Sequence, residues 1–422
     1  MPPSTERGHF RSFTVIQMML AAACGMIVAN TYYAQPLTGL ISATFGMPRA
    51  STGLLVTLPL AGYGIGLLTI VPLGDLFENR RLALTLIGAE MLFTLALSFA
   101  TRPATYLLIA FLIGIVASVV QLLVPYVTYL VPEQAQGRAV GRVVSGVMLG
   151  VMLARPVSSM IASFWSWREV FRMSAMLMVA VCVALRLVLP PRSPAQPPNY
   201  GSLLRSLGHI FASTELLRRR GIYHAATFGA FSVFWTAVPL WLSSPRFGLS
   251  QRGIAWVALA GVAGAIAPPI AGRIADKGLS QAGTAAAMLL ASASFLLSDL
   301  ALGHSDLSLA ILVAAAILLD FAVSANLVLS QRAIYSLGSA QRSRVNGLFM
   351  ATFFAGGAIS SALSGWAFAH FGWAGVSVLG MLLPLAALLY FSTERRTPVI
   401  ECVSAGSAFC QHVRNDAGHL TK

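Results

Sequence analysis

VPLGDLFENRRLAL, residues 71–84, is a short charged loop between two long apolar runs, and AGRIADKG, residues 271–278, is a second such loop in the other half of the chain. A run of about 20 mostly apolar residues is long enough to cross the hydrocarbon core of a bilayer as a helix. Charged loops this short, placed between such runs, indicate helices that cross a membrane one after another.

The composition supports a membrane protein and excludes a soluble one. Of the 422 residues, 57% are hydrophobic and only 10% are charged, whereas a soluble domain carries about 25% charged residues. The net charge of +14 would suggest nucleic acid in a soluble protein. Here the arginines lie between apolar runs and form no patch interleaved with aromatic residues, so we expect a lipid bilayer and no nucleic acid as the partner.

Apolar runs long enough to span the bilayer occur twelve times along the chain. The sequence therefore predicts an all-α integral membrane protein with twelve transmembrane helices, close to residues 13–37, 51–73, 82–100, 104–131, 139–164, 169–190, 221–243, 252–275, 281–302, 306–332, 343–368 and 372–392. The first run is expected to be retained, because no Ala-x-Ala-like cleavage site follows it shortly.

The placement of the basic residues predicts the orientation. Cytoplasmic loops carry an excess of Lys and Arg. With both termini cytoplasmic, most basic residues fall inside, and those left outside are Arg49, Arg102, Arg168, Arg172, Arg246 and Arg252. We therefore expect a multi-pass protein of the cell inner (plasma) membrane, acting as a monomer.

The two halves of the chain show an internal repeat. A shift of 206 residues places Ser118 on Ser324, Tyr129 on Tyr335, Arg138 on Arg344, Gly141 on Gly347 and Trp167 on Trp373. Two six-helix pseudo-repeat bundles are predicted, residues 1–190 and 221–392, followed by a cytoplasmic tail, 393–422. The linker between them, 191–220, should carry a short helix at the membrane surface, with one apolar face formed by Leu203, Leu207, Ile210 and Phe211.

Both charged loops resemble the Gly-x-Leu-Ala-Asp-Arg-x-Gly-Arg-Arg signature of the major facilitator superfamily, at the same place in each half. The first loop departs from the signature at Val71, Leu76, Glu78 and Asn79; the residues that match are Leu73, Gly74, Asp75 and Arg80, with Gly272, Ala275, Asp276 and Lys277 in the second loop. The resemblance implies the major facilitator fold, in which the first, fourth, seventh and tenth helices line a central cavity. It also implies transport by alternating access.

The same loops predict a conformational latch. Asp75 at a helix end can accept N–H groups from a neighbouring helix start, and Arg80 or Arg81 can pair with its carboxylate. We expect Asp276 and Arg344 to take part in the second half. Such contacts form only while the inner side is closed, so they would bias the transport equilibrium.

The first run, with ANTYYAQPL (29–37), and the tenth, with LLDFAVSANLVLSQ (318–331), resemble those of a bacterial efflux branch related to twelve-helix drug/proton antiporters. Two positions depart from that group. Ala110 stands four residues before Gly114, where the group commonly has arginine, and Arg155-Pro156 stands where its fifth helix has Gly-Pro. The mechanism must therefore be argued from the residues present.

Charged residues at membrane depth are rare and normally face a cavity or a partner. Asp320, near the middle of its run, is a candidate proton carrier or substrate-binding acid. Arg155 cannot release a proton at accessible pH, so it should bind an anionic group or hold a carboxylate ionised, Asp320 included. Glu90 lies in a peripheral helix, and we interpret it as a buried structural hydrogen bond.

Amides, phenols and indoles along the predicted cavity-lining helices suit an amphipathic solute. The expected lining residues, besides Arg155, are Asn30, Tyr33, Gln35, Gln121, Tyr126, Trp235 and Asn326. For each of these, packing between helices is an alternative interpretation.

The leading function is that of a secondary transporter, an exporter driven by proton exchange. Uptake or facilitated passage of a small metabolite, anionic metabolites included, is the alternative, and a non-transporting sensor would look the same in sequence. No Gly-x4-Gly-Lys-Ser/Thr phosphate loop is present, so ATP is not expected to be the direct energy source. The seven histidines are scattered without a metal-ligand spacing, so we expect no enzyme, metal or cofactor.

Overall fold

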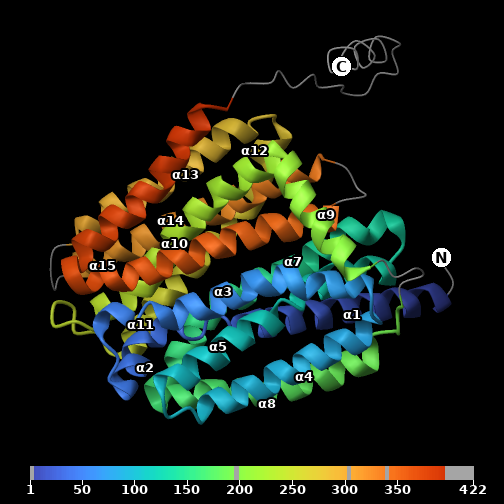
Figure 1. Ribbon diagram of the computed structural model, residues 1–422, viewed down its shortest axis with the longest axis horizontal. Helices are drawn as coiled ribbons and strands as arrows, with labels where there is room; N and C mark the ends of the chain where they lie inside the picture. The colour runs from blue at the N-terminus through green and yellow to red at the C-terminus, as the bar shows by residue number, and fades with distance from the viewer. Residues whose placement is uncertain (1–3, 194–198, 302–305, 338–341, 395–422) are drawn as a thin grey trace.

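The computed structural model describes residues 4–193, 199–301, 306–337 and 342–394, and every regular element in these ranges is a helix. The first half of the chain forms the lower part of the molecule in Figure 1 and the second half the upper part, with α3 of the first half lying alongside α15 of the second. The predicted tail, 393–422, lies almost entirely outside the described residues.

The first half alternates long α-helices with short 3-10 segments, and glycine and proline mark most of the interruptions. Its elements are α1 (Ser4–Ala29), η1 (Gln35–Leu37), α2 (Thr38–Phe45), η2 (Arg49–Ser51), α3 (Leu54–Thr69), η3 (Val71–Asp75), α4 (Asn79–Ser98), α5 (Pro103–Ala117), α6 (Val120–Tyr126), η4 (Val127–Leu130), α7 (Glu133–Phe164) and α8 (Trp167–Val188).

The linker and the second half follow the same plan. The linker carries α9 (Tyr200–Ser213). The second half consists of α10 (Glu215–Leu242), α11 (Gln251–Ala260), η5 (Gly261–Ile266), α12 (Ala267–Asp276), α13 (Ser280–Asp299), α14 (Asp306–Tyr335) and α15 (Arg342–Ser392).

The twelve predicted crossings are accounted for in the described residues. Ten helical stretches are long and apolar enough to span a membrane, and one of them, 344–392, has 49 residues. At 1.5 Å per residue that stretch would be more than twice the thickness of a bilayer core, and non-helical Gly372 (φ 61°, ψ −149°) breaks it into two crossings. The first crossing combines α1, η1 and α2 around a turn at residues 30–34.

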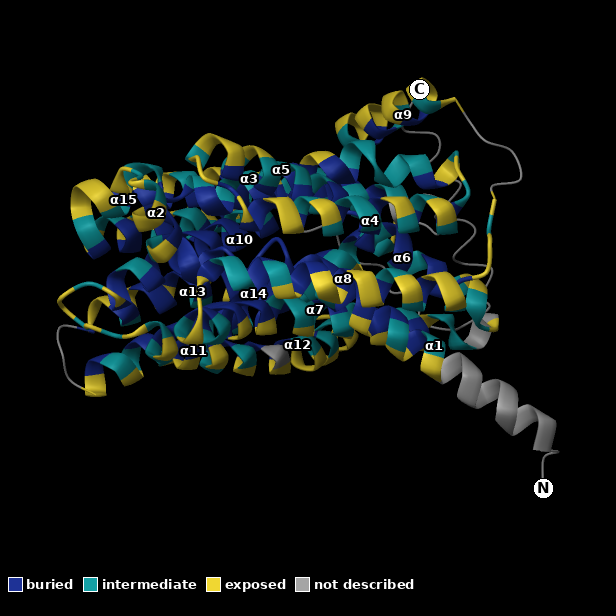
Figure 2. Ribbon diagram, turned by 90° about the horizontal axis from the view of Figure 1, so that it is seen from below, coloured by how far each residue is buried: buried dark blue, intermediate teal, exposed yellow. Residues whose placement is uncertain are grey.

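The halves meet along two helix pairs. α3 of the first half packs against α15 of the second, and α7 packs against α11. α10 is the most enclosed of the ten stretches, with 83% of its most apolar 18-residue segment buried. Figure 2 shows exposed residues mainly on the outward faces of the other helices. α10 therefore lies in the interior of the molecule, enclosed by other helices.

The sequence suggested that the linker helix α9 rests on the membrane with its apolar face, but in the structure this face packs on the protein. Leu203, Leu207 and Ile210 are buried against the protein, where α9 contacts η3 of the first half and α10 and α15 of the second. Tyr200 donates a hydrogen bond of 3.0 Å to the carbonyl of Thr69 in α3. The amphipathic pattern was correct, but the surface it covers belongs to the protein itself.

We call the end that carries α9 and η3 the inner end, because the arginine balance predicts it to be cytoplasmic. The last turn of α15 is at this end too, since Thr393 accepts a hydrogen bond from Arg219 near the start of α10. The opposite end, with α2, η2 and the start of α11, is the outer end (Figure 1).

Candidate functional site

Arg155 lies deep between the two halves, on α7. The helix continues through Pro156, and the side chain of Arg155 is only 1% exposed. Ser158 donates a hydrogen bond of 3.1 Å to the Arg155 carbonyl, so a hydroxyl group supports the backbone at this position.

The counter-charge of Arg155 comes from the other half of the chain. Nη2 of Arg155 is 3.3 Å from Oδ2 of Asp320 on α14, and the Asp320 side chain is also 1% exposed. Trp235 of α10 donates a hydrogen bond of 2.8 Å from its indole N–H to Oδ1 of the same carboxylate. The pairing considered from the sequence is thus present in the structure, and it joins the halves.

Aromatic faces surround the guanidinium group. The Arg155 Cζ atom is 4.0 Å from the ring centroid of Trp235 and 4.9 Å from that of Phe231, both on α10. These distances allow cation–π attraction, which is strongest where water is excluded. The Nε and Nη1 atoms of Arg155 have no hydrogen-bond partner among the described residues, so the group retains unused donors.

Two glycines of η5 allow the chain to approach Asp320 closely. A Cβ atom added at Gly264 would lie 2.7 Å from the Asp320 Cβ, and one added at Gly261 would lie 2.7 Å from its Oδ2. Real Cβ contacts are longer, so a side chain at Gly264 would clash with the backbone of Asp320, and one at Gly261 would displace the carboxylate. The interrupted eighth crossing therefore packs its backbone directly on the ion pair.

The break in the first crossing brings two more polar groups toward this region. Tyr32 is 2% exposed, and its phenol interacts electrostatically with Arg155. Gln35 in η1 is 1% exposed, and neither atom of its amide has a hydrogen-bond partner among the described residues. η1 contacts α7, α10 and α11, which places Gln35 at the junction of the two halves.

The outer end is closed above the pair. Gln251 at the start of α11 donates hydrogen bonds to the Pro36 carbonyl (2.9 Å) and to Ser159 Oγ (2.7 Å). On the other helix pair, Thr57 Oγ1 of α3 lies 2.9 Å from Ser361 Oγ of α15. Hydrogen bonds and close backbone contacts therefore hold the halves together on this side.

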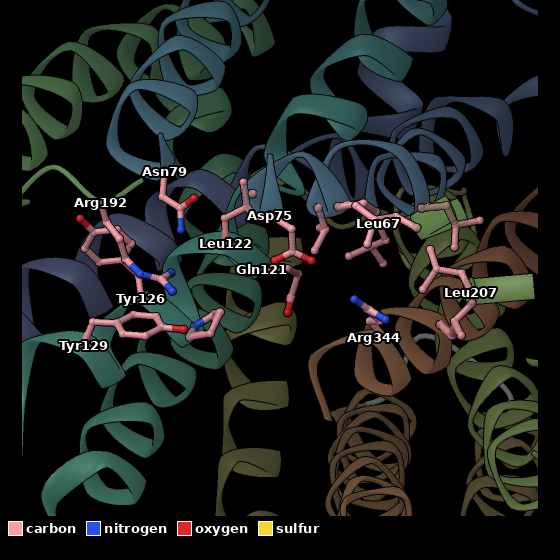
Figure 3. Close-up of a pocket in the computed structure, with 18 residues that line it drawn as sticks. Leu67, Asp75, Asn79, Gln121, Leu122, Tyr126, Tyr129, Arg192, Leu207 and Arg344 are labelled. Atoms are coloured by element: carbon pink, nitrogen blue, oxygen red, sulfur yellow. The ribbon is translucent and has the colours of Figure 1, made fainter. Parts of the chain in front are cut away.

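The inner end opens into a vestibule, a cavity of about 500 Å³ between the halves. Its walls come from α3, η3, α6, η4, α9 and α15, and include Asp75, Gln121, Tyr126, Arg192 and Arg344. Figure 3 shows Asp75 and Arg344 on opposite walls, with both side chains directed into the cavity. The molecule is thus open at its inner end.

An aromatic layer separates the vestibule from the ion pair. Gln121 donates a hydrogen bond of 3.3 Å to the hydroxyl of Tyr63 on α3, and the Tyr63 ring lies 4.4 Å from that of Phe354 on α15. The ring centroids of Phe354 and Phe228 are 5.5 Å apart, and Phe228 stacks on Phe231 with ring centroids 5.4 Å apart. We call these four aromatic residues, Tyr63, Phe354, Phe228 and Phe231, the aromatic layer.

Comparison with known proteins identifies the architecture. Residues 18–310 match the family described as the Major Facilitator Superfamily. The chain belongs to the major facilitator superfamily. It is 37% identical to "Uncharacterized transporter YgaY" of Escherichia coli O157:H7, over 91% of this chain and 96% of that protein. It is 33% identical to "Probable transporter SCO4007" of Streptomyces coelicolor, over 87% of this chain and 85% of that protein.

Solved structures agree on the fold. A POT family transporter in complex with 5-aminolevulinic acid superimposes with a TM-score of 0.70 at 15% identity, covering 92% of this chain and 96% of that one. A bacterial homologue of the human lysosomal transporter Spinster, in an inward-facing and unoccupied conformation, gives 0.64 at 14% identity, covering 90% and 95%. The protein is thus a multi-pass secondary transporter of this superfamily, and the family is one of transporters and not of enzymes.

In this transporter, the predicted latch residues lie apart. Asp75 is exposed and forms no ion pair with a described residue, while Arg81 pairs with Glu78 at 3.4 Å and Arg80 donates to the Arg186 carbonyl. Glu78, a departure from the family signature, caps the start of α4 by accepting the N–H groups of Arg80 and Arg81. In the second half, Asp276 pairs with Arg332 of α14.

Three predicted cavity residues face other helices of their own half. Asn30 donates to Glu90 at 2.8 Å and accepts from Ser174 at 2.6 Å, between α4 and α8. Tyr33 packs edge-on against Phe171 of α8 and borders a groove between α1 and α7. Asn326 donates to Thr227 of α10 at 2.9 Å, inside the second half. These placements favour the packing interpretation for all three.

Of the other predicted lining residues, Gln35, Arg155 and Trp235 lie at the central junction, and Gln121 and Tyr126 lie in the vestibule. Tyr126 donates its hydroxyl to the Pro190 carbonyl, which ties the linker to the vestibule wall. Sequence reasoning missed Tyr32, Phe231 and Gln251. For Gln251, the signal was an amide at the very start of a span, next to the predicted outer surface.

Proposed function

We propose that this transporter exports a small solute across the bacterial plasma membrane in exchange for protons, and that Asp320 carries the coupling proton. The observation that carries the proposal is the buried ion pair between Arg155 of the first half and Asp320 of the second. A contact between charges in different halves is one that alternating access must make and break.

Protonation changes this contact directly. A proton taken up by the Asp320 carboxylate removes its charge, which leaves Arg155 attracted only by aromatic faces and dipoles. Arg155 itself releases no proton at accessible pH. Proton binding therefore weakens the attraction between the halves, and proton release restores it, so the occupancy of Asp320 biases the equilibrium between inward-open and outward-open states.

The surroundings of the pair favour an amphipathic solute. Phe231 and Trp235 offer flat apolar faces, while the phenol of Tyr32 and the amide of Gln35 offer hydrogen bonds. A few polar groups in a mostly apolar wall are typical of sites for small organic molecules. To reach them from the vestibule, a solute has to pass the aromatic layer.

A second candidate is the transport of an organic anion. Arg155 has two nitrogen atoms, Nε and Nη1, without a hydrogen-bond partner among the described residues. Buried donors of this kind are costly unless they find acceptors, and a guanidinium group binds carboxylates through paired N–H groups. In this version the solute anion competes with Asp320 for Arg155.

The experiment uses the purified transporter in liposomes with an imposed pH gradient and a dye that reports proton flux. Panels of lipophilic cations and of small carboxylates are added to the wild type, to Asp320→Asn and to Arg155→Ala. We expect cations to collapse the gradient in the wild type and Asp320→Asn to abolish this. Asp299→Asn, which changes an exposed carboxylate at the end of α13, is the matched control and should behave as the wild type.

The opposite pattern would support the second candidate. If only carboxylates drive proton flux, and Arg155→Ala abolishes it, the solute is an anion held by Arg155. Proton-independent flux of every solute, with Asp320→Asn fully active, would contradict coupling at Asp320.

We also propose that Asp75 and Arg344 form the inner latch, with Arg80, Arg81 and Asp276 at its edge. Their positions on opposite walls of the vestibule support this, because closure of the inner end would bring those walls together (Figure 3). Asp75→Asn should then favour the inward-open state. Equal spin-label distances across the inner end in this variant and in the wild type would contradict the latch.

A further inference from the structure

Glu90 on α4 is a fully buried carboxyl group away from the central pair. It is 0% exposed, and its Oε1 atom accepts a hydrogen bond of 2.8 Å from the Asn30 amide. Its Oε2 atom has no hydrogen-bond partner among the described residues. One turn nearer the outer end, the Thr94 hydroxyl is equally buried and also lacks a partner there.

The groups that face Glu90 supply no positive charge. Phenols interact with its carboxyl from two sides, Tyr33 from the break in the first crossing and Tyr63 from α3. On α5, Tyr106 is buried against aromatic rings, and on α8 Ser174 donates a hydrogen bond to Asn30, the partner of Glu90. No Lys, Arg or His among the described residues forms an ion pair with Glu90.

An ionised carboxylate without a counter-charge is expensive in such surroundings. A protonated one is compatible with them: Oε1 accepts from Asn30, which leaves Oε2 to carry the proton. The Asn30 amide is held in the donating orientation, because its oxygen already accepts a hydrogen bond of 2.6 Å from Ser174. The network is therefore arranged to receive a neutral acid.

Asn30 connects this network to the moving part of the molecule. It is the first residue of the turn that breaks the first crossing, and the segment after the turn carries Tyr32 and Gln35 to the centre. The same segment forms part of the outer contact, since the Pro36 carbonyl accepts a hydrogen bond from Gln251. When the outer end opens, this segment has to move, and the bond that anchors it to α4 is the one to Glu90.

We propose that Glu90 is a second proton-binding site, which binds one proton while the outer end is closed and releases it when the first crossing shifts. The inference rests on the proposed function, because it adds a proton to the same transport cycle. The step is a simple proton exchange: the carboxylate takes up a proton and becomes the neutral acid, and the acid releases that proton and becomes the carboxylate again. Glu90 touches no solute, so its role is to position the broken segment according to its proton occupancy.

The test is infrared difference spectroscopy of the purified full-length transporter in lipid, comparing acid with alkaline buffer. A protonated carboxyl group shows a carbonyl stretch that the ionised group lacks, and buried acids absorb at higher frequency than exposed ones. We expect two high-frequency bands in the wild type. Asp320→Asn should remove one, Glu90→Gln the other, and the exposed-site control Asp299→Asn neither.

A further variant tests the assignment. Asn30→Ala removes the donor to Oε1, so the Glu90 band should shift to higher frequency while the Asp320 band stays in place. A spectrum of Glu90→Gln identical to that of the wild type would overturn the proposal. If that variant does not fold, a wild-type spectrum whose buried-acid bands all disappear in Asp320→Asn would overturn it equally.

The two proposals fail separately. If Glu90→Gln removes a band and Asp320→Asn removes none, the second site stands and coupling at the central pair is refuted. The reverse result would refute the second site alone.

Discussion

A single methyl group at Gly365 should change which way the transporter faces. Gly365 lies on α15 at the outer contact with η2 and α3. A Cβ atom added there would lie 2.6 Å from the Gly53 nitrogen and 3.0 Å from the Gly53 Cα, which are backbone atoms that cannot rotate away. Gly53 in turn faces the backbone of Ser361 and Ala362, so the two helices touch through glycine on both sides.

The magnitude follows from these distances. Non-bonded carbon atoms are comfortable at about 3.5–4.0 Å, so Gly365→Ala requires the halves to separate by about 1 Å at this point. Overpacking of a close contact typically costs about 1–3 kcal/mol. The penalty applies only while the outer end is closed, because the halves part there in the outward-open state. An energy difference of about 1–3 kcal/mol between two states corresponds to a population shift of about 5–150-fold.

Distances between spin labels measure the shift. One pair, on exposed Arg49 and His370, reports the outer end, and a second, on exposed Phe77 and Leu279, reports the inner end. Gly365→Ala should lengthen the outer distance and shorten the inner one. Gly88→Ala on α4 is the matched control, because a Cβ atom there meets nothing within 4 Å. A folded Gly365→Ala protein with wild-type distances in both pairs would refute the reasoning.

Three further changes test other parts of the structure. Asp320→Asn leaves Arg155 buried without a counter-charge, so thermal unfolding should show a free energy of unfolding lower by about 3–5 kcal/mol. Arg155→Met in the same chain should recover most of this loss. A double variant as unstable as the single one would argue against an isolated pair. Gly264→Ala would place a Cβ atom 2.7 Å from the Asp320 Cβ and 2.9 Å from its carbonyl carbon, so proton flux in liposomes should fall well below that of Gly88→Ala. Leu207→Asp puts a charge on the buried face of α9, so limited proteolysis should cut the linker faster while both halves stay intact, and an unchanged cleavage rate would contradict the packing of α9 on the protein.

The sequence was most informative where one strong physical constraint acts on many residues. Backbone groups in lipid must be satisfied within each segment, so long apolar runs can only be helices, and all twelve crossings were predicted close to their observed positions. The same constraint makes a buried charge conspicuous. Arg155 and Asp320 were therefore identified as candidates by their position inside apolar runs, and the structure brings them together.

The fine placement of side chains could not be predicted, because it depends on breaks in the helices. A continuous first helix was assumed to carry Asn30 and Tyr33 on one face toward the centre. The turn at residues 30–34 rotates the following segment, so Tyr32, which was not predicted, reaches the centre together with the predicted Gln35. A polar Asn30 six residues before Pro36 was the available signal of such a break.

The linker shows a different limit. An amphipathic helix has one apolar face whether it rests on lipid or on protein, and its sequence pattern does not distinguish the two surfaces. α9 packs on both halves because the vestibule presents apolar residues at its mouth, among them Leu67 and Leu348. That information lies in the arrangement of distant segments and not in the linker itself.

The central pair also explains why a permanent charge is kept in the membrane. A buried ion pair seldom stabilises a fold, since the loss of hydration is about as large as the attraction. Its value here is conditional: Arg155 belongs to one half and Asp320 to the other, so the attraction exists only in states that bring the halves together at the centre. An apolar pair of the same shape would hold that state permanently, whereas one proton on Asp320 cancels the ionic contact. Burial without full pairing therefore suits a switch better than it suits a structural bond.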